Sequence, residues 1–318
     1  MIQNPRIIFM GTPEFAVATL DAIRTANYNV VAVITAPDKP AGRGQQLSQS
    51  AVKQYAVANN IDVLQPEKLK NEDFIATLKS YNADLQIVVA FRMLPEIVWA
   101  IPRMGTVNLH GSLLPQYRGA APINWALING ELQSGITTFK LQQQIDTGDI
   151  LLHQAVDITH DMNAGELHDI LMNLGGELIV KTINGLVNNT IVEQPQPNYE
   201  IKHAPKLFKD NTKINWNTTA QHIHNLVRGL SPYPTAHTVL IDENKNELSL
   251  KIFETIIIDN STVNNMCGTV VTDGKTYMHV HTQQHLISVL NLQLAGKKRM
   301  TIHDFLRGFK LTNNFVLQ

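Results

Sequence analysis

The sequence has 318 residues and a net charge of −1 at pH 7, with 26 lysines and arginines against 27 aspartates and glutamates. This length exceeds what one hydrophobic core usually organises, so we expect two domains, and the near-neutral charge argues against a strongly basic nucleic-acid-binding protein. The single cysteine, Cys267, excludes an internal disulfide and a cysteine-based zinc site within one chain. The N-terminus lacks a secretory pattern, and no apolar run approaches the roughly 18 residues of a membrane span. We therefore expect a cytoplasmic protein without a membrane partner.

The first half of the sequence alternates strand-like apolar runs with amphipathic patterns of helical period. The strand-like runs cover residues 6–10, 29–35, 85–90 and 106–110. The helical patterns cover residues 15–23, 51–59 and 72–80. This alternation predicts an α/β fold with a mostly parallel sheet that is covered on both faces. In such sheets ligands bind beyond the carboxyl ends of the strands.

Two further predicted strands, at residues 136–141 and 150–158, flank a loop that contains Asp146. A long apolar stripe then predicts a helix, in which Gly175-Gly176 marks a weak point or a close packing point. A polar stretch with two prolines follows at residues 193–198 and is typical of a linker.

The character of the sequence changes after this stretch. A helical pattern at residues 223–230 precedes five short β-rich runs, at 236–241, 248–258, 268–272, 277–281 and 286–294. These runs predict a small antiparallel barrel, such as an oligonucleotide-binding (OB-like) fold, or a sandwich. We therefore predict a first domain at residues 1–189, a linker at 190–206 and a second domain at 207–318.

Residues 107–115 combine polar side chains at the end of a predicted strand. Asn108 and His110 point to the same face, because strand residues alternate. An amide and an imidazole can donate hydrogen bonds to the oxyanion of an acyl transfer, and a neutral imidazole can accept the proton of an attacking amine. A carboxylate such as Asp146 would fix the histidine tautomer. The alternative is structural, with Asn108 and His110 satisfying main-chain groups of the turn and Asp146 capping its own turn.

Other reactive groups are not indicated. Gly111-Ser112 lacks the Gly-x-Ser-x-Gly frame of a nucleophile elbow, so direct transfer to the amine is the simpler chemistry. His279 and His281 share a strand face but have no apparent third ligand, so no metal site is expected.

Four basic residues are candidates for contact with phosphate groups. Arg43 lies between two glycines in a loop after a predicted strand. Lys297 and Lys298 belong to a compact positive run, and Arg228 ends a predicted helix. Residues 207–318 carry 11 basic and 8 acidic side chains, so phosphate binding and an ordinary solvated surface are both open there.

These motifs together closely resemble the methionyl-tRNA formyltransferase family. The motifs are Gly11-Thr-Pro-Glu-Phe-Ala16, Asp38-x-Pro-Ala-Gly-Arg-Gly44, Asn108-x-His-Gly-Ser-Leu-Leu-Pro115, Arg118-Gly-Ala-Ala-Pro122 and Asp146-Thr-Gly148. Lys213-Ile-Asn-Trp216, Pro232-x-Pro234 and Ala295-Gly-Lys-Lys298 extend the likeness over nearly the whole chain in the same order.

The resemblance implies a Rossmann-like formyltransferase domain and a barrel-like domain that helps to hold tRNA. It implies transfer of a formyl group from 10-formyltetrahydrofolate, a consumed donor, to the α-amine of methionyl initiator tRNA, without a metal. We expect a monomer. Asn108, His110 and Asp146 match the family's catalytic residues, and Arg43 matches an arginine that reaches the acceptor stem. The folate-binding segment is matched by Ser112, Leu113, Leu114 and Pro115.

Three segments depart from the family pattern, and other functions remain open. Gln45-Gln46 stands where lysines are usual, Phe91–Pro95 replaces a Tyr/Phe-Gly segment, and Gln144-Ile145 replaces Gly-Leu. A glycinamide ribonucleotide formyltransferase or an amino-sugar nucleotide N-formyltransferase would share the chemistry. A dinucleotide-dependent oxidoreductase would need a Gly-x-Gly-x-x-Gly after the first strand, which is absent. An RNA-binding module alone would leave the three polar residues without a role.

Overall fold

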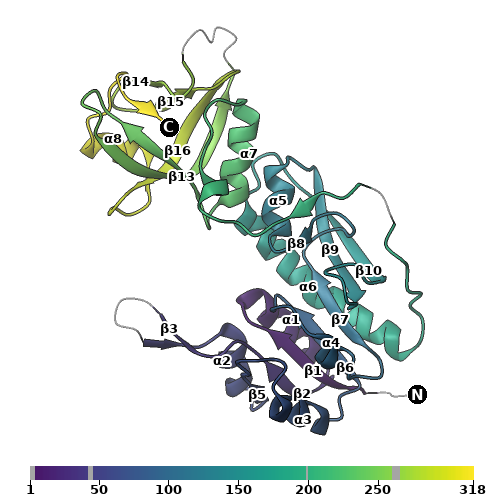
Figure 1. Ribbon diagram of the computed structural model, residues 1–318. Coiled ribbons are helices and arrows are strands. Elements are labelled where there is room, and N and C mark those ends of the chain that lie inside the picture. The colour runs from purple at the N-terminus through teal and green to yellow at the C-terminus, as the bar shows by residue number, and fades with distance from the viewer. Residues whose placement is uncertain (1–3, 42–45, 198–199, 260–265) are drawn as a thin grey trace. The chain divides into compact units, whose positions relative to one another are not determined.

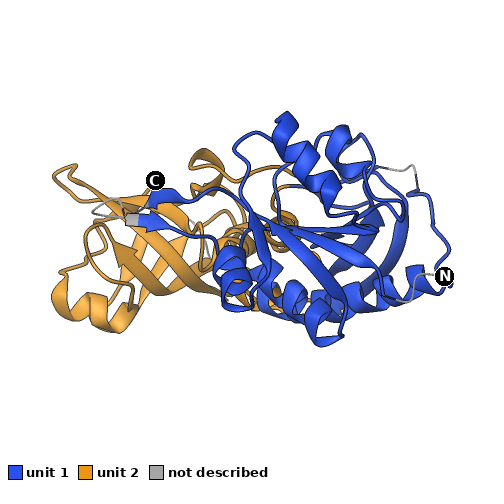
Figure 2. Cartoon of the chain, turned by 90° about the horizontal axis from the view of Figure 1, so that it is seen from below, with its two compact units in different colours: residues 1–119, 134–156, 168–203 blue, residues 120–133, 157–167, 204–318 orange. Residues whose placement is uncertain are grey.

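The computed structural model describes residues 4–41, 46–197, 200–259 and 266–318. The chain divides into two compact units, each assembled from three segments of the chain (Figure 2). Unit 1 comprises residues 1–119, 134–156 and 168–203, and unit 2 comprises residues 120–133, 157–167 and 204–318. The predicted domain limits at 189 and 207 stay a prediction, because two early segments of the chain belong to unit 2.

Unit 1 is built on a seven-stranded sheet in the order β10-β9-β7-β6-β1-β2-β5 (Figure 1). The strands are β1 (Arg6–Gly11), β2 (Asn29–Ile34), β5 (Asp62–Leu64), β6 (Leu85–Val89), β7 (Thr106–His110), β9 (Gln133–Lys140) and β10 (Ile150–Asp157). The run from β5 to β7 is parallel, and β9 is antiparallel to β7. The predicted α/β fold with a mostly parallel sheet is therefore confirmed.

Helices cover both faces of this sheet. They are α1 (Glu14–Thr25), α2 (Ala51–Ala58), α3 (Glu72–Ser80), α4 (Glu96–Trp99) and α6 (Ala164–Val187). Side-chain caps start two of them, because Ser50 accepts from the Lys53 amide and Asn71 accepts from the Phe74 amide. Apolar residues of α3 and α4 pack in one cluster with Ile8, Met10, Ile34 and Val88 of the sheet.

The long helix α6 lies on the other face of the sheet. Its two adjacent glycines allow it to pack closely there. A Cβ on Gly175 would lie 2.8 Å from Leu109 of β7, and one on Gly176 would lie 2.9 Å from Ala22 of α1. These glycines therefore mark close packing. By length and composition alone, α6 is long and apolar enough to cross a membrane. This criterion tolerates polar residues within the helix, so it does not require an unbroken apolar run. Its buried leucines and its glycine contacts are those of a core helix.

Two short pairings lie outside the main sheets. Strands β3 (Lys39–Ala41) and β4 (Gln46–Ser48) form an antiparallel pair. Strand β8 (Arg118–Gly119) pairs with β11 (His203–Ala204). The second pairing matters for the site, because it anchors the chain beyond residue 190 on the loop that follows β7.

Unit 2 contains a near-closed antiparallel barrel with strand order β14-β15-β16-β13-β12-β18. The strands are β12 (Ala236–Ile241), β13 (Glu247–Ile258), β14 (Val270–Thr272), β15 (Met278–His281), β16 (Leu286–Leu294), β17 (Met300–Thr301) and β18 (Val316–Leu317). A bridge between Thr269 and Val316 joins the two ends of this order. The alternative of a sandwich, left open by the sequence, is thereby decided in favour of a barrel.

The helical elements of unit 2 are α5 (Pro122–Ile128), η1 (Asp210–Thr212), α7 (Ala220–Leu230) and α8 (Ile302–Gly308). Helix α7 packs on β13 and on α5, and its residues Ile223, Val227 and Leu230 belong to the barrel core. The predicted helix at 223–230 is confirmed as part of α7.

Candidate active site

The structure brings His110 and Asp146 together, which sequence spacing alone did not do. His110 ends β7 and is 6% exposed, and Asp146 lies in the β9–β10 loop and is 8% exposed. Nδ1 of His110 is 3.8 Å from Oδ2 of Asp146. Asn108 lies two residues before His110 on the same strand face and is half-buried. All three belong to unit 1.

A main-chain carbonyl fixes the tautomer of His110. Nε2 of the ring lies 2.9 Å from the carbonyl oxygen of Tyr117, which can only accept, so Nε2 carries the hydrogen. In the neutral ring, Nδ1 then presents its lone pair toward Asp146. The prediction that the carboxylate fixes the tautomer therefore needs correction, because Tyr117 does so.

The Asp146 carboxylate is held by the loop after β7. Its Oδ2 accepts a hydrogen bond of 2.9 Å from the Gly119 amide. Asp146 has a positive φ of 55°, which is uncommon for a residue with a side chain. Contacts that maintain this conformation are therefore part of the construction of the site.

Gln196 provides such contacts, and sequence reasoning missed it. Its Nε2 donates to the carbonyl oxygens of Asp146 at 2.9 Å and of Gly148 at 2.8 Å. Its Oε1 accepts from the guanidinium of Arg118. Gln196 stands between two prolines, which restrict the main chain on both sides, and that was the available signal.

The predicted folate-binding segment is a turn stabilised from within. The Ser112 hydroxyl is buried and donates to the Gln116 carbonyl at 2.6 Å. Thr137 donates to the Ser112 carbonyl and accepts from the Leu114 amide. The Leu114–Pro115 peptide bond is cis. The turn directly follows His110, which agrees with a ligand-binding role. The Ser112 hydroxyl, however, is already hydrogen-bonded to the Gln116 carbonyl.

The four basic candidates differ in their surroundings. Arg43 lies outside the described residues, as does Gln45. Lys297 and Lys298 are exposed in the turn after β16. Arg228 is 7% exposed and donates to Asn225 and to the carbonyls of two residues that precede α6. These contacts give Arg228 a structural role inside unit 2. Its buried position does not support the prediction that it contacts phosphate.

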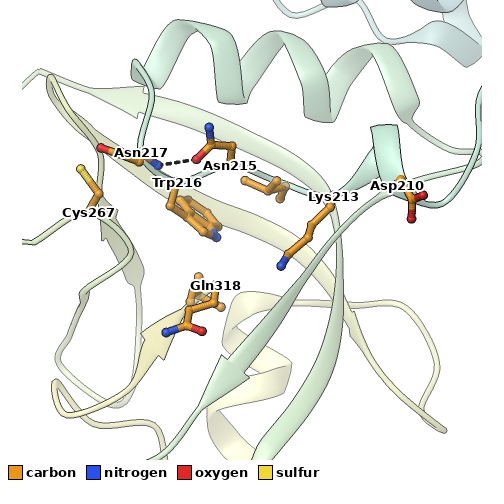
Figure 3. Close-up of a pocket in the computed structure, with 9 residues that line it drawn as sticks. Asp210, Lys213, Asn215, Trp216, Asn217, Cys267 and Gln318 are labelled. Carbon is orange, nitrogen blue, oxygen red and sulfur yellow. Dashed lines mark hydrogen bonds between the residues drawn. The ribbon is translucent and has the colours of Figure 1, made fainter.

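The Lys213–Trp216 motif lines a pocket of unit 2 with a volume of about 460 Å³ (Figure 3). Trp216 is buried in the barrel core, and its indole donates to the Thr238 hydroxyl at 2.9 Å. Lys213 and Cys267 line the same pocket. The motif therefore has a structural role in the barrel, and none of the predicted catalytic residues lines this pocket.

Models of known protein families match both parts of the chain. Residues 5–183 match the model of the formyl transferase family and residues 206–310 match its C-terminal domain. The chain belongs to the formyl transferase family. The two matches lie on either side of residues 184–205, close to the predicted linker.

Curated relatives cover nearly the whole chain. A methionyl-tRNA formyltransferase of Bacteroides thetaiotaomicron is 50% identical over 319 residues, with 99% of each chain covered. One of Flavobacterium johnsoniae is 52% identical over 313 residues, with 98% of each covered. Their similarity includes the second part of the chain as well as the first.

Solved structures share the fold at lower identity. A sugar 3N-formyl transferase crystallised with dTDP and 5-N-formyl-THF has a TM-score of 0.65 at 22% identity, over 93% of this chain and 100% of that one. HypX from Aquifex aeolicus in complex with tetrahydrofolic acid has a TM-score of 0.63 at 15% identity, over 98% of this chain and 49% of that one. These matches support the fold.

Proposed function

We propose that this protein transfers a formyl group from 10-formyltetrahydrofolate to the α-amino group of methionyl initiator tRNA, which gives N-formylmethionyl-tRNA. The observation that carries the proposal is the buried pairing of His110 with Asp146 at 3.8 Å. This pairing occurs in a formyl transferase chain that is about half identical to methionyl-tRNA formyltransferases along its whole length.

The geometry of the pair suits an incoming amine. With Nε2–H donated to Tyr117, Nδ1 of His110 and Oδ2 of Asp146 are two acceptors 3.8 Å apart. A nitrogen placed about 2.9 Å from each atom would donate one hydrogen to each. The α-amine has a pKa of about 8, just above neutrality, so a minority of it is unprotonated and nucleophilic at physiological pH. The pair thus orients the amine and offers Nδ1 as the base.

The two substrates supply every atom and proton that the transfer requires. The amine nitrogen attacks the formyl carbon, and the resulting oxyanion accepts a hydrogen bond from the Asn108 amide. The side chain of Asn108 makes no hydrogen bond to another described residue and is half-buried, so it is available to the substrate. His110 takes the proton that the amine loses, beside the Asp146 carboxylate. The bond from the formyl carbon to folate N10 breaks, and the proton passes to that nitrogen.

The folate donor is bound, we infer, at the turn of residues 112–115. This turn follows directly after His110, so a formyl group held there would lie close to the amine. Because the Ser112 hydroxyl is engaged with Gln116, main-chain groups and the Leu113 side chain carry the contact. Folate acts as a consumed donor, and the transfer needs no metal.

The tRNA would be held by basic residues that neutralise phosphates. Lys297 and Lys298 are the exposed candidates in unit 2, and Arg43 is the candidate in the first part of the chain. The curated relatives that match along the whole chain are bacterial proteins, and their names include a tRNA substrate. We infer that the protein acts as a cytoplasmic monomer.

A second candidate function is N-formylation of an amino-sugar nucleotide. It is favoured by the fold match to an N-formyltransferase of Helicobacter canadensis crystallised with folinic acid and dTDP-3-aminofucose, at 22% identity and a TM-score of 0.64. The identity of about 50% to methionyl-tRNA formyltransferases outweighs it.

An acceptor comparison tests the proposal. Purified full-length protein is incubated with 10-formyltetrahydrofolate and methionyl initiator tRNA, methionyl elongator tRNA, glycinamide ribonucleotide or dTDP-3-aminofucose. We expect product with initiator tRNA at a kcat/KM at least 100-fold above the others. Turnover of a small acceptor with none of the tRNA would refute the proposal.

A further inference from the structure

Two histidines and one aspartate of unit 2 form a cluster that the proposed reaction does not use. His160 and Asp161 lie in the segment between β10 and α6, and His224 lies on α7. One ligand atom from each residue lies within 4.8 Å of the other two. Nδ1 of His160 is 2.8 Å and Nε2 of His224 is 3.6 Å from the same carboxylate oxygen of Asp161.

The buried ring of His224 has one satisfied and one unsatisfied nitrogen. His224 is 3% exposed, and its Nδ1 lies 3.2 Å from the Thr255 hydroxyl. Its Nε2 is buried without a hydrogen-bond partner among the described residues. When Nδ1–H is donated to Thr255, the lone pair of Nε2 faces the Asp161 carboxylate. In this tautomer two acceptors face each other, and a cation between them would satisfy both. In the other tautomer the Thr255 hydroxyl donates to Nδ1 and Nε2–H points at Asp161.

The surroundings of His224 match those of a metal-binding histidine. A ligating imidazole usually donates its other N–H to an oxygen, and the Thr255 hydroxyl oxygen lies 3.2 Å from Nδ1, in place to accept it. Burial lowers the pKa of His224, a polar contact with the main chain of His160 raises it, and the charge of Arg228 lowers it. The neutral imidazole is the form that binds metals.

Arg228 holds the cluster in place. Its Nη1 donates to the carbonyls of Thr159 at 3.4 Å and Met162 at 3.2 Å, on either side of the two exposed ligands. The segment that carries His160 and Asp161 is thus tied to the helix that carries His224. The positive charge of Arg228 opposes a cation nearby, and the Asp161 carboxylate offsets it.

We propose that His160, Asp161 and His224 bind one divalent transition-metal ion of the zinc class. Two imidazoles and a carboxylate are ligands that zinc accepts, with a fourth position left for water. Tetrahedral zinc separates its ligand atoms by about 3.3 Å. The His224–Asp161 separation of 3.6 Å is close to that value, whereas His160 and Asp161 are hydrogen-bonded at 2.8 Å and would have to move apart to bind the ion. The ion would link the segment before α6 to α7. This site was not expected from the sequence.

Metal titration tests the proposal. Full-length protein without an affinity tag is stripped with a chelator and titrated calorimetrically with Zn²⁺ alone, and then with Co²⁺, whose visible absorption reports the coordination. We expect one saturable ion per chain, a higher Tm in its presence, and binding at least tenfold weaker in His160→Ala and Asp161→Asn. Both residues are exposed, so these variants should fold, whereas replacement of buried His224 could unfold the chain.

His168→Ala is the matched control. His168 and Asp169 form a similar pair, with Nδ1 and Oδ1 2.9 Å apart, but they belong to no cluster of three ligands among the described residues. This variant should bind Zn²⁺ as the wild type does. Equal affinity in wild type, His160→Ala and His168→Ala would overturn the proposal, as would the absence of saturable binding.

Discussion

The side-chain amide of Gln196 donates a hydrogen bond of 2.9 Å to the main-chain carbonyl of Asp146. It thereby connects a segment predicted as a linker to a predicted catalytic carboxylate. The same amide binds Gly148, and Arg118 donates to the other end of the Gln196 side chain. Gln196 therefore acts on the site through the conformation of Asp146, as a positioning residue.

Gln196→Ala should lower kcat about 10-fold or more with a smaller change in KM for folate, because the Asp146 carboxylate is no longer held at a fixed position. Effects of this kind on catalysis follow from small misplacements of a reacting group. Formylation kinetics measure it. The control is Gln194→Ala, since Gln194 pairs with Ile150 through its main chain and its side chain is exposed. Equal losses in both variants would assign Gln196 a general structural role.

Asp146→Ala and His110→Ala should each lower kcat about 100-fold or more, because the proton acceptor loses its partner or is removed. The double variant should be only slightly worse than either single variant, since the two side chains act as a unit. Rapid-mixing or steady-state formylation assays decide this. Independent, multiplicative losses would contradict the pairing seen in the structure.

Lys297→Ala with Lys298→Ala should raise the KM for tRNA several-fold and leave the KM for folate unchanged, because the loss removes two phosphate-neutralising charges. The slope of log affinity against log salt should become less negative by up to about two. Lys275→Ala, in the turn between β14 and β15, removes one positive charge and is the control for each of the two single variants, Lys297→Ala and Lys298→Ala. An identical salt slope in the double variant and the wild type would exclude these lysines from the tRNA surface.

Arg228→Met should reduce the free energy of unfolding by about 1–3 kcal/mol, because main-chain acceptors and the Asn225 side chain lose a buried donor. The KM for tRNA should stay within about twofold, as the guanidinium is only 7% exposed. Denaturant unfolding and formylation kinetics separate the two roles. A large rise in KM at unchanged stability would restore Arg228 as a tRNA contact.

We expect Asp273 to make the stability of the folded protein depend on pH. Hydrogen bonds, first from Thr276 and then from the amide of Lys275, hold the pKa of Asp273 well below its ordinary value. A carboxylate with a lowered folded pKa contributes stability above the unfolded pKa of about 3.9, and this contribution is lost as the pH falls through the folded pKa. The Tm difference between wild type and Asp273→Ala should therefore be constant from pH 7 to 5 and shrink below pH 4. A difference that grows on acidification would show that the turn is stabilised in another way.

Local patterns in the sequence predicted the α/β sheet, the barrel strands and the placement of Asn108 and His110 at the end of β7. These features depend on hydrophobic period and strand alternation, which near neighbours in the chain determine. The motifs likewise identified the family that the comparisons confirm. Residue types offered Asp146 as a candidate carboxylate partner of His110, and the resemblance then matched it to a catalytic residue of the family.

Contacts between distant parts of the chain were decided only by the tertiary structure. Residue spacing could not show that Asp146 faces His110, that Tyr117 fixes the histidine tautomer, or that Gln196 returns to the Asp146 loop. It also could not distinguish buried Arg228 from exposed Lys297, because both are simply basic in the sequence. The physical reason is that burial and hydrogen-bond partners are properties of three-dimensional packing, which residue type and spacing do not encode locally.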